Sequence, residues 1–116
     1  MKMITALIRP ERLDAVEEAL AQVLDEGDNF RITVDTVEGR GRAEGEVEYV
    51  RGQPVRIRMV HKTRVMLAVN DAYVEKAIAA IVQAAREGTV GDGKIFVTPL
   101  DEVVRIRTGE RGGQAI

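Results

Sequence analysis

The sequence predicts an α+β fold with the element order βαββαβ, the ferredoxin-like double βαβ arrangement. Two stretches carry apolar residues at helical spacing, and strand-like runs precede and follow each of them. The length of 116 residues fits a single domain, residues 1–116. Hydrophobic residues make up 45% of the chain but aromatic residues only 3%, so the core must be aliphatic.

The first half of the chain predicts a strand, a helix and a second strand. Met3 to Ile8 reads as a strand that Pro10 ends. Pro10 also suits the start of a helix that runs on from Glu11. Residues 25–29 read as a loop, and residues 30–37 alternate as a strand does. The apolar stripe of the helix comprises Leu13, Val16, Ala19, Leu20, Val23 and Leu24.

The second half predicts a strand, a helix and a last strand. Residues 56–69 read as a long strand that is partly alternating. Asn70 or Asp71 would cap the second helix, and Gly88 would end it. Residues 95–99 read as the fourth strand. The buried face of this helix would carry Val74, Ala77, Ile78, Ile81, Val82 and Ala85.

A sheet of this kind with both helices on one face leaves its other face uncovered. A chain this small usually covers such a face with copies of itself, so we expect a homo-oligomer. The net charge of −2 and the pI of about 5.5 give no indication of nucleic-acid binding. The chain has no cysteine, no signal-peptide pattern and no apolar run long enough to span a membrane. We therefore expect a cytoplasmic protein without membrane insertion.

A glycine-rich loop between the second helix and the last strand is the first candidate site. Its sequence, EGTVGDGKIFV, runs from Glu87 to Val97. Glycines allow close approach to the backbone, whose N–H groups can cradle phosphate, and Lys94 adds positive charge. The loop is not a Walker P-loop, because Ile95 replaces the Ser or Thr and because the order is helix, loop, strand. The alternative is a glycine-rich connection without a ligand.

Two arginines near the C-terminus form a second candidate. Arg105 and Arg107 are two residues apart, so on an extended chain both would point to one side. Ile106 would then face the other way, into a core. Guanidinium groups donate paired hydrogen bonds to phosphate, which indicates an anion site. The alternative is a solvated edge strand.

The segment from Gly39 to Val55 is too long for an ordinary hairpin connection. It holds four glycines, one proline and charges of both signs. We interpret it as a protruding interaction arm, and the alternative is a long β-ribbon with solvated charges.

Three motifs together resemble the PII signal-transduction proteins: MKMITALIRP at the start, GDGKIFV at residues 91–97 and RIRTGERG at residues 105–112. The resemblance covers nearly the whole chain. It implies a homotrimer that binds ATP or ADP in clefts between subunits, and many members also bind 2-oxoglutarate with Mg²⁺. It also implies a T-loop (about 39–56) that docks on an enzyme, transporter or regulator, a B-loop (about 87–94) and a C-terminal tail (about 101–116).

The resemblance implies nucleotide-binding roles for four groups of residues. The B-loop contacts phosphate, the C-terminal arginines reach a neighbouring subunit's nucleotide, a threonine lines the adenine side, and the T-loop base meets phosphate. In that order, these residues are Gly91, Asp92, Gly93 and Lys94; Arg105 and Arg107; Thr33; and Gly41 and Arg42.

The chain departs from the family pattern in several places. Ala43 stands where the family has a glutamine that supports Mg²⁺ and 2-oxoglutarate. Lys62 matches a lysine used on 2-oxoglutarate, but His61 replaces the usual proline. Val55 aligns with the uridylylated tyrosine, and Tyr49 lies elsewhere in the loop. About four extra residues follow the first helix. The sequence thus predicts a divergent PII-like protein that senses nucleotide and is not uridylylated, with 2-oxoglutarate and Mg²⁺ binding in question.

Two other functions remain open at this point. A nucleotide-hydrolysing enzyme is one, although a single histidine, no cysteine and no suitably spaced carboxylate pair suggest no catalytic residues. A metal-linked trimer of the divalent-cation-tolerance kind is the other, but His61 alone gives no metal site. We expect a non-enzyme with an unidentified target protein, which could be a membrane transporter.

Overall fold

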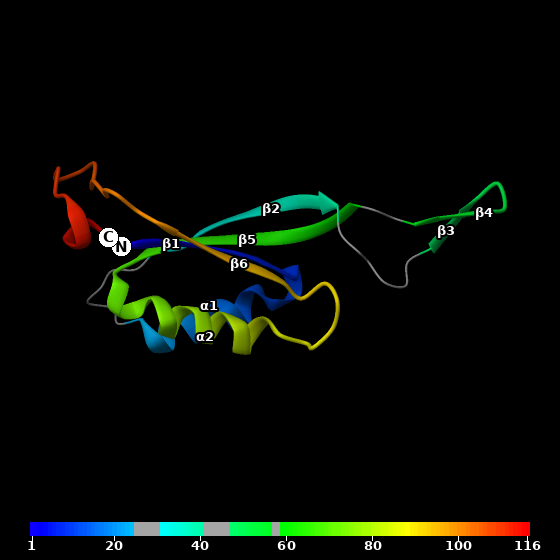
Figure 1. Cartoon of the computed structure of the whole chain (residues 1–116), viewed down its shortest axis with the longest axis horizontal. Coiled ribbons are helices and arrows are strands. Elements are labelled where there is room, and N and C mark those ends of the chain that lie inside the picture. Colours follow the sequence, from blue (N-terminus) through cyan, green and yellow to red (C-terminus); the bar gives the residue numbers. More distant parts are fainter. Residues whose placement is uncertain (25–30, 41–46, 57–58) are drawn as a thin grey trace.

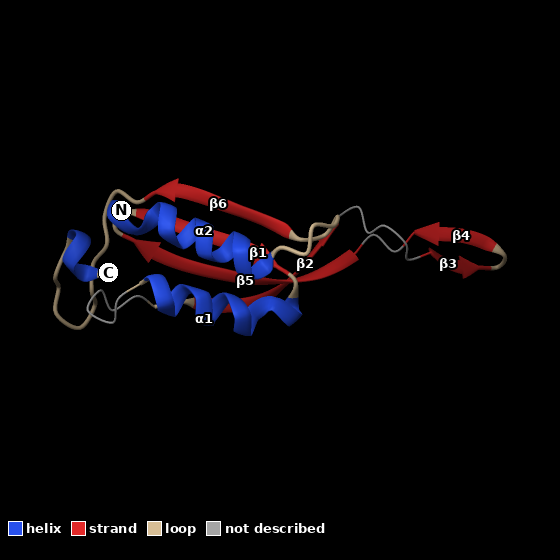
Figure 2. Ribbon diagram, turned by 90° about the horizontal axis from the view of Figure 1, so that it is seen from below, coloured by secondary structure: helices blue, strands red, loops and turns tan. Residues whose placement is uncertain are grey.

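The computed structural model describes residues 1–24, 31–40, 47–56 and 59–116. One four-stranded antiparallel sheet carries two helices on a single face (Figures 1 and 2). Its strands lie in the order β2-β5-β1-β6. This arrangement confirms the predicted ferredoxin-like α+β fold. The elements are β1 (Lys2–Ile8), α1 (Leu13–Val23), β2 (Thr33–Arg40), β5 (Met59–Val69), α2 (Val74–Ala85) and β6 (Gly93–Pro99).

The core lies between the sheet and the two helices and is aliphatic, as the composition predicts. Alternate residues of β1 and β5 point toward the helices, because strand side chains alternate between the two faces. The apolar stripes of α1 and α2 meet them at helical spacing. The most deeply buried side chains are Ile4, Ile8, Val16, Leu20, Val65, Leu67 and Ile81.

The helix boundaries differ from the prediction. Each helix is preceded by a 3₁₀ turn, η1 (Pro10–Arg12) or η3 (Asp71–Tyr73), so the predicted first turns are tighter than α-helical. Asn70 precedes η3 without a side-chain capping bond, and its amide donates instead to the Gly113 carbonyl at 3.1 Å. The prediction that Gly88 ends the second helix is wrong. The helix ends at Ala85, and Arg86 is already extended.

Three strand boundaries also differ. The second strand begins at Thr33 and continues to Arg40, later than the predicted residues 30–37. The predicted strand over 56–69 is divided, because Arg56 ends β4 (Gln53–Arg56) and β5 begins at Met59. The last strand begins at Gly93, where the register with Ile8 of β1 begins. The predicted loop at 25–29 lies outside the described residues.

The long segment between β2 and β5 contains a two-stranded hairpin. Its strands, β3 (Val47–Val50) and β4 (Gln53–Arg56), pair antiparallel around Arg51 and Gly52. Both turn residues have positive φ, 52° and 76°, which a tight two-residue hairpin turn requires. Figure 1 shows this hairpin standing away from the main sheet. The ribbon alternative is therefore present in the described part of the segment, and the ribbon protrudes.

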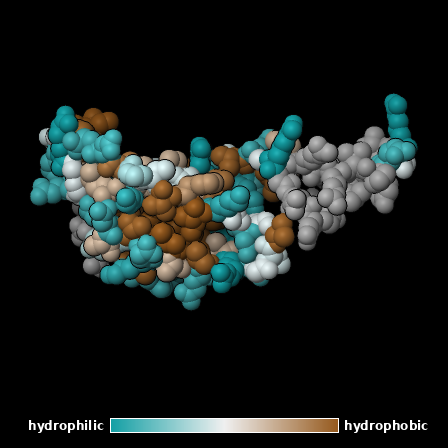
Figure 3. Space-filling model, viewed as in Figure 1, coloured by the Kyte–Doolittle hydropathy of each residue, from teal (hydrophilic) through white to brown (hydrophobic). Residues whose placement is uncertain are grey.

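None of the described helices covers the other face of the sheet. Its apolar residues include Met3, Leu7 and Met66, with Phe96 of the edge strand half exposed at 50%. An ion pair between Arg64 and Asp35, at 2.5 Å, lies at its margin. Figure 3 shows a further gathering of apolar atoms over α2 and β6, where Val82 and Val97 are exposed.

The Gly93→Ala substitution tests the contact that fixes the start of β6. Gly93 has φ of 106°, and an added Cβ would lie 1.7 Å from the carbonyl oxygen of Leu7. Backbone strain and this overlap should reduce the free energy of unfolding by at least about 3 kcal/mol. Urea unfolding measures the change. The matched control is Gly39→Ala in β2, where nothing lies within 4 Å of the new Cβ. Equal stability of the two variants would contradict the close approach.

Candidate functional site

The candidate residues form two groups at opposite ends of the edge strand β6. The loop cluster comprises residues 87–94 with Arg9 and Lys62, and it lies where β6 begins. The tail cluster comprises Arg31, Arg105 and Arg107, and it lies beyond the end of β6. Since β6 has seven residues, the two clusters are separated by about 20 Å at roughly 3.3 Å per residue.

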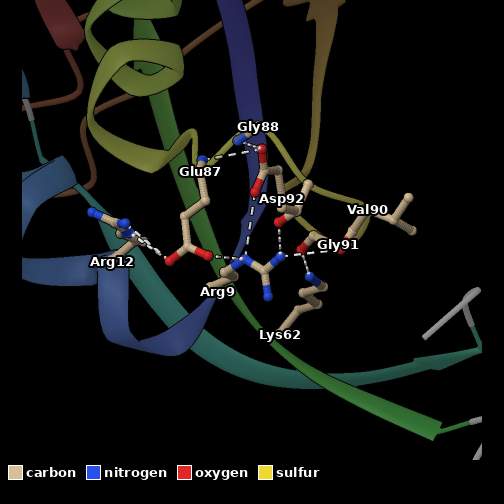
Figure 4. A network of polar contacts seen from close by, with 9 residues as sticks. Arg9, Arg12, Lys62, Glu87, Gly88, Val90, Gly91 and Asp92 are labelled. Carbon is tan, nitrogen blue, oxygen red and sulfur yellow. Dashed lines mark hydrogen bonds and ion pairs between the residues drawn. The ribbon is translucent and has the colours of Figure 1, made fainter. Parts of the chain in front are cut away.

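Asp92 organises the glycine-rich loop from within. Its Oδ2 accepts hydrogen bonds from the backbone N–H groups of Glu87, at 3.1 Å, and Gly88, at 2.8 Å (Figure 4). Its own N–H donates to the Thr89 carbonyl at 3.3 Å. Partial burial acts to raise the pKa of Asp92, but these N–H donors together with Arg9 outweigh it and lower the pKa. The Asp92 carboxylate therefore stabilises the conformation of the loop through these hydrogen bonds.

Arg9 holds the same loop from outside. It directly follows β1, so its side chain leaves the sheet edge beside the loop. Its Nε lies 3.3 Å from Glu87 Oε2 and 3.4 Å from Asp92 Oδ1. Its Nη2 donates to Thr89 Oγ1 at 2.9 Å and to the Val90 carbonyl at 3.1 Å. Figure 4 shows the guanidinium lying between the acidic side chains and the tip of the loop. Five donors in a planar fork suit this task.

Lys62 contacts the loop from β5. Its ammonium donates to the Gly91 carbonyl (Figure 4). Desolvation lowers the pKa of Lys62, the positive charge of Arg9 lowers it further, and Asp92 and Glu11 partly offset both effects. Two cationic side chains therefore lie together beneath the loop.

Lys94 is the loop cation that remains available. It is exposed on β6 and forms no hydrogen bond or ion pair with any residue that the structure describes. A cavity of about 410 Å³ adjoins it, with Asp92 and Gly93 on the polar side. The apolar side consists of Leu7, Ile8, Ile78, Ile81, Val82, Ala85 and Ile95.

The tail does not form the predicted extended strand. The N–H of Gly109 donates to the Arg105 carbonyl at 2.7 Å, and the N–H of Arg105 donates to the Glu110 carbonyl at 2.9 Å. These bonds close a turn, so the alternation argument fails. The prediction that Ile106 faces a core is wrong, because this side chain is 100% exposed.

Arg105 nevertheless lies with Arg107 around one cavity. This cavity has a volume of about 640 Å³ and is also lined by Arg31, Ala68 and the end of the tail. The Arg105 guanidinium lies 3.4 Å from Glu110 Oε2. It also donates to the carbonyls of Gln114, at 3.2 Å, and Ile116, at 3.4 Å. The chain continues there into η4 (Gly112–Ala115), so Arg105 fastens the tail as well as facing the cavity.

The predicted nucleotide-binding residues do not all lie together within one chain. Gly91, Asp92, Gly93 and Lys94 lie together at one sheet end, next to Lys62. Thr33 begins β2 opposite Met66, level with Phe96 in the middle of β6 and so between the two clusters. Gly41, Arg42 and Ala43 lie outside the described residues.

Sequence reasoning missed two arginines. Arg9 is the ninth residue of the motif MKMITALIRP, and nothing in the pattern indicates that it reaches a loop some eighty residues later. Arg31 lies two residues before Thr33, and the alternation of the predicted strand over residues 30–37 puts both on one face, but it indicates no binding role for Arg31.

Two absences concern the described residues alone. Within ranges 1–24, 31–40, 47–56 and 59–116, no three His, Asp or Glu side chains come together as metal ligands would. None of the described helices has the length and apolar character needed to cross a membrane.

The fold and the clusters define a small α+β domain with cationic clusters at both ends of one edge strand. The chain belongs to the nitrogen regulatory protein P-II family, whose profile matches residues 1–110. It is 50% identical over 116 residues to nitrogen regulatory protein P-II of Azospirillum brasilense and 48% identical to that of Rhodospirillum rubrum, covering both whole chains in each case. It is 47% identical to nitrogen regulatory protein P-II 2 of Methanothermobacter thermautotrophicus, covering 97% of that protein.

P-II proteins are signal-transduction regulators rather than enzymes. The predicted resemblance to this family is confirmed over the length of the chain. The comparisons support neither the nucleotide-hydrolysing alternative nor the metal-linked one.

The Asp92→Asn substitution tests the charge within the loop. Since the pKa of Asp92 in the folded protein lies below its unfolded value of about 3.9, the carboxylate stabilises the fold fully above that pH. This stabilisation is lost as pH falls through the folded pKa. Wild type should therefore unfold at a higher temperature than the variant at pH 6, with the gap closing as the pH falls from about 3.9 through the lowered pKa of Asp92. Asp101→Asn, an exposed change outside the loop, is the control. A gap independent of pH would contradict the assignment.

Proposed function

We propose that this chain is a P-II signal-transduction protein that binds ATP or ADP in the clefts of a homotrimer and regulates a target protein through its T-loop. The observation that carries the proposal is the separation of two cationic clusters to opposite ends of β6. Family membership supplies the nucleotide and the number of subunits.

The separation supports a site shared between two copies. Charge-assisted hydrogen bonds to phosphate are about 2.7–2.9 Å long, so cations that hold one phosphate chain must be close to each other. Within one chain the clusters are about 20 Å apart. Lys94 of one copy and Arg107 of the next can converge on one nucleotide only across an interface.

The uncovered sheet face supports the assembly. Met3, Leu7, Met66 and the half-exposed Phe96 form an apolar surface that a second and third copy would bury. Burying apolar surface contributes about 25 cal/mol per Å². We infer that the three sheets face one another and that the edge strands form the sides of the clefts.

Within such a cleft the residues divide by chemistry. The backbone of the loop, with Lys94, receives the phosphates, and Asp92 acts by holding the loop. Arg105 and Arg107 reach the phosphates from the neighbouring copy. Thr33 lies level with the middle of β6, between the loop and tail clusters, where its hydroxyl can hydrogen-bond the adenine. Gly41 and Arg42 are proposed to meet the phosphates from the base of the T-loop.

The T-loop is proposed as residues 39–56. Its described part is the β3–β4 hairpin, which protrudes beyond the sheet (Figure 1). A protruding hairpin offers backbone and side-chain contacts to a partner without disturbing the core. The target would be an enzyme, regulator or membrane transporter in contact with the cytoplasm. Val55 replaces the tyrosine that other members modify, so signalling would not involve uridylylation.

Calorimetry on the Lys94→Ala and Arg107→Ala variants tests the nucleotide site. Each removes one charge-assisted phosphate contact, which should cost about 1.5–3 kcal/mol and weaken ATP affinity by about tenfold or more. Lys76→Ala, on the outer surface of α2, removes the same charge outside the cleft and should leave the affinity unchanged. If all three variants bound ATP as the wild type does, the clusters would be solvated surface charges.

Light scattering or sedimentation at micromolar protein tests the assembly. The uncovered apolar face should produce a stable trimer. A monomer under these conditions would remove the shared site and, with it, the proposed function.

The Ala43 position predicts weak binding of 2-oxoglutarate. An alanine offers no oxygen to a hard cation such as Mg²⁺, so the metal bridge between effector and phosphates would be lost. Without it, the phosphates repel a dicarboxylate even where Lys62 attracts it. Titrating 2-oxoglutarate into the MgATP-loaded protein should show little binding, and Ala43→Gln should strengthen it. Micromolar affinity in the unaltered protein would contradict this prediction.

A further inference from the structure

We propose that Arg31 is a third anion-binding residue of the tail cluster and contacts the phosphates of the bound nucleotide together with Arg107. This inference rests on the proposed function for the identity of the ligand. Its structural basis is one cavity of about 640 Å³ that Arg31, Arg105 and Arg107 line from two separate parts of the chain.

The backbone places Arg31 on the uncovered face of the sheet. Strand β2 pairs with β5 from Thr33 opposite Met66. Continuing this antiparallel register by two residues brings Arg31 opposite Ala68, and both residues line the cavity. Ile32, between them, packs against the core from the helix side. Strand alternation therefore directs Arg31 and Thr33 to the same side, away from the helices.

The three arginines differ in the hydrogen bonds and ion pairs that they form within the chain. Arg105 is engaged by Glu110 and by two tail carbonyls. Arg31 and Arg107 form no hydrogen bond or ion pair with any part of the chain that the structure describes. Among the described tail residues, Glu110 pairs with Arg105, and Glu102 lies 3.5 Å from Arg111.

This distribution leaves two uncompensated guanidinium groups at one cavity. Like charges brought together repel, and an anion between them relieves the repulsion while satisfying their donors. Because Arg31 comes from the start of a strand and Arg107 from the tail, the two forks can approach a phosphate chain from different sides. Such an arrangement favours a ligand with several phosphoryl groups over one with a single group.

Affinities measured by calorimetry on four variants test the inference: Arg31→Ala, Arg31→Lys, Arg107→Ala and the control Lys76→Ala. The ligands are ATP, ADP and AMP, with inorganic tripolyphosphate as a probe that carries no base. Arg31→Ala should weaken ATP by about tenfold, as Arg107→Ala does, and AMP by less. Arg31→Lys keeps the charge but loses the fork, so its loss should be smaller. Since no described partner is removed, the thermal unfolding of Arg31→Ala should match wild type.

The outcomes separate this inference from the proposed function. If Arg107→Ala weakened ATP while Arg31→Ala bound it like wild type or like Lys76→Ala, the role of Arg31 would be overturned and the function retained. Equal losses for ATP, ADP and AMP would also overturn the phosphate contact. Binding of tripolyphosphate that depends on Arg31, without any binding of ATP, would support the anion site and overturn the nucleotide function. A wild-type protein that bound neither ligand would overturn both.

Discussion

The close approach of Gly93 to the Leu7 carbonyl is the constraint on which the candidate site depends. A side chain at this position would overlap the β1 backbone, so only glycine allows β6 to pair along the whole of β1. That pairing fixes the point at which the loop ends and the strand begins. After seven residues β6 ends at the opposite end of the sheet, and the tail begins there. The two cationic clusters are therefore held apart by the rigid pairing of one edge strand.

The clusters also differ in how their charges are balanced. In the loop, the carboxylates of Asp92 and Glu87 form ion pairs with Arg9 and Arg12. These ion pairs hold the loop backbone in one shape before any phosphate binds. In the tail cluster, Arg105 pairs with Glu110, whereas Arg31 and Arg107 form no ion pair with any described residue. In the proposed trimer, the loop of one copy and the tail arginines of the next would therefore contribute different features to a shared site. The loop would supply geometry, and the tail would supply charge.

The elements and their order could be read from the sequence because long apolar periodicities dictate them, as in α2 and β1. The residues at which helices and strands begin and end were harder to predict from the sequence. The start of β6 is set by its register with β1, which no local sequence pattern encodes. Both helices are shorter than predicted because a 3₁₀ turn forms their first residues. Local alternation misplaced Ile106, because hydrogen bonds to Gly109 and Glu110 fold the tail into a turn. The glycine loop was identified by composition, whereas Arg9 was missed because its contacts span a large sequence separation.

Mixed trimers test the central claim, that each ligand site is shared between copies, most directly. Lys94→Ala and Arg107→Ala protomers should each bind ATP weakly, but a site formed between one of each kind would receive both intact residues. Random mixing of equal amounts should restore about one site in four with wild-type affinity, as measured by ATP titration of the co-refolded protein. The account predicts this recovery. Mixed samples that bind ATP no better than either variant alone would contradict it, and would place the complete site within a single chain.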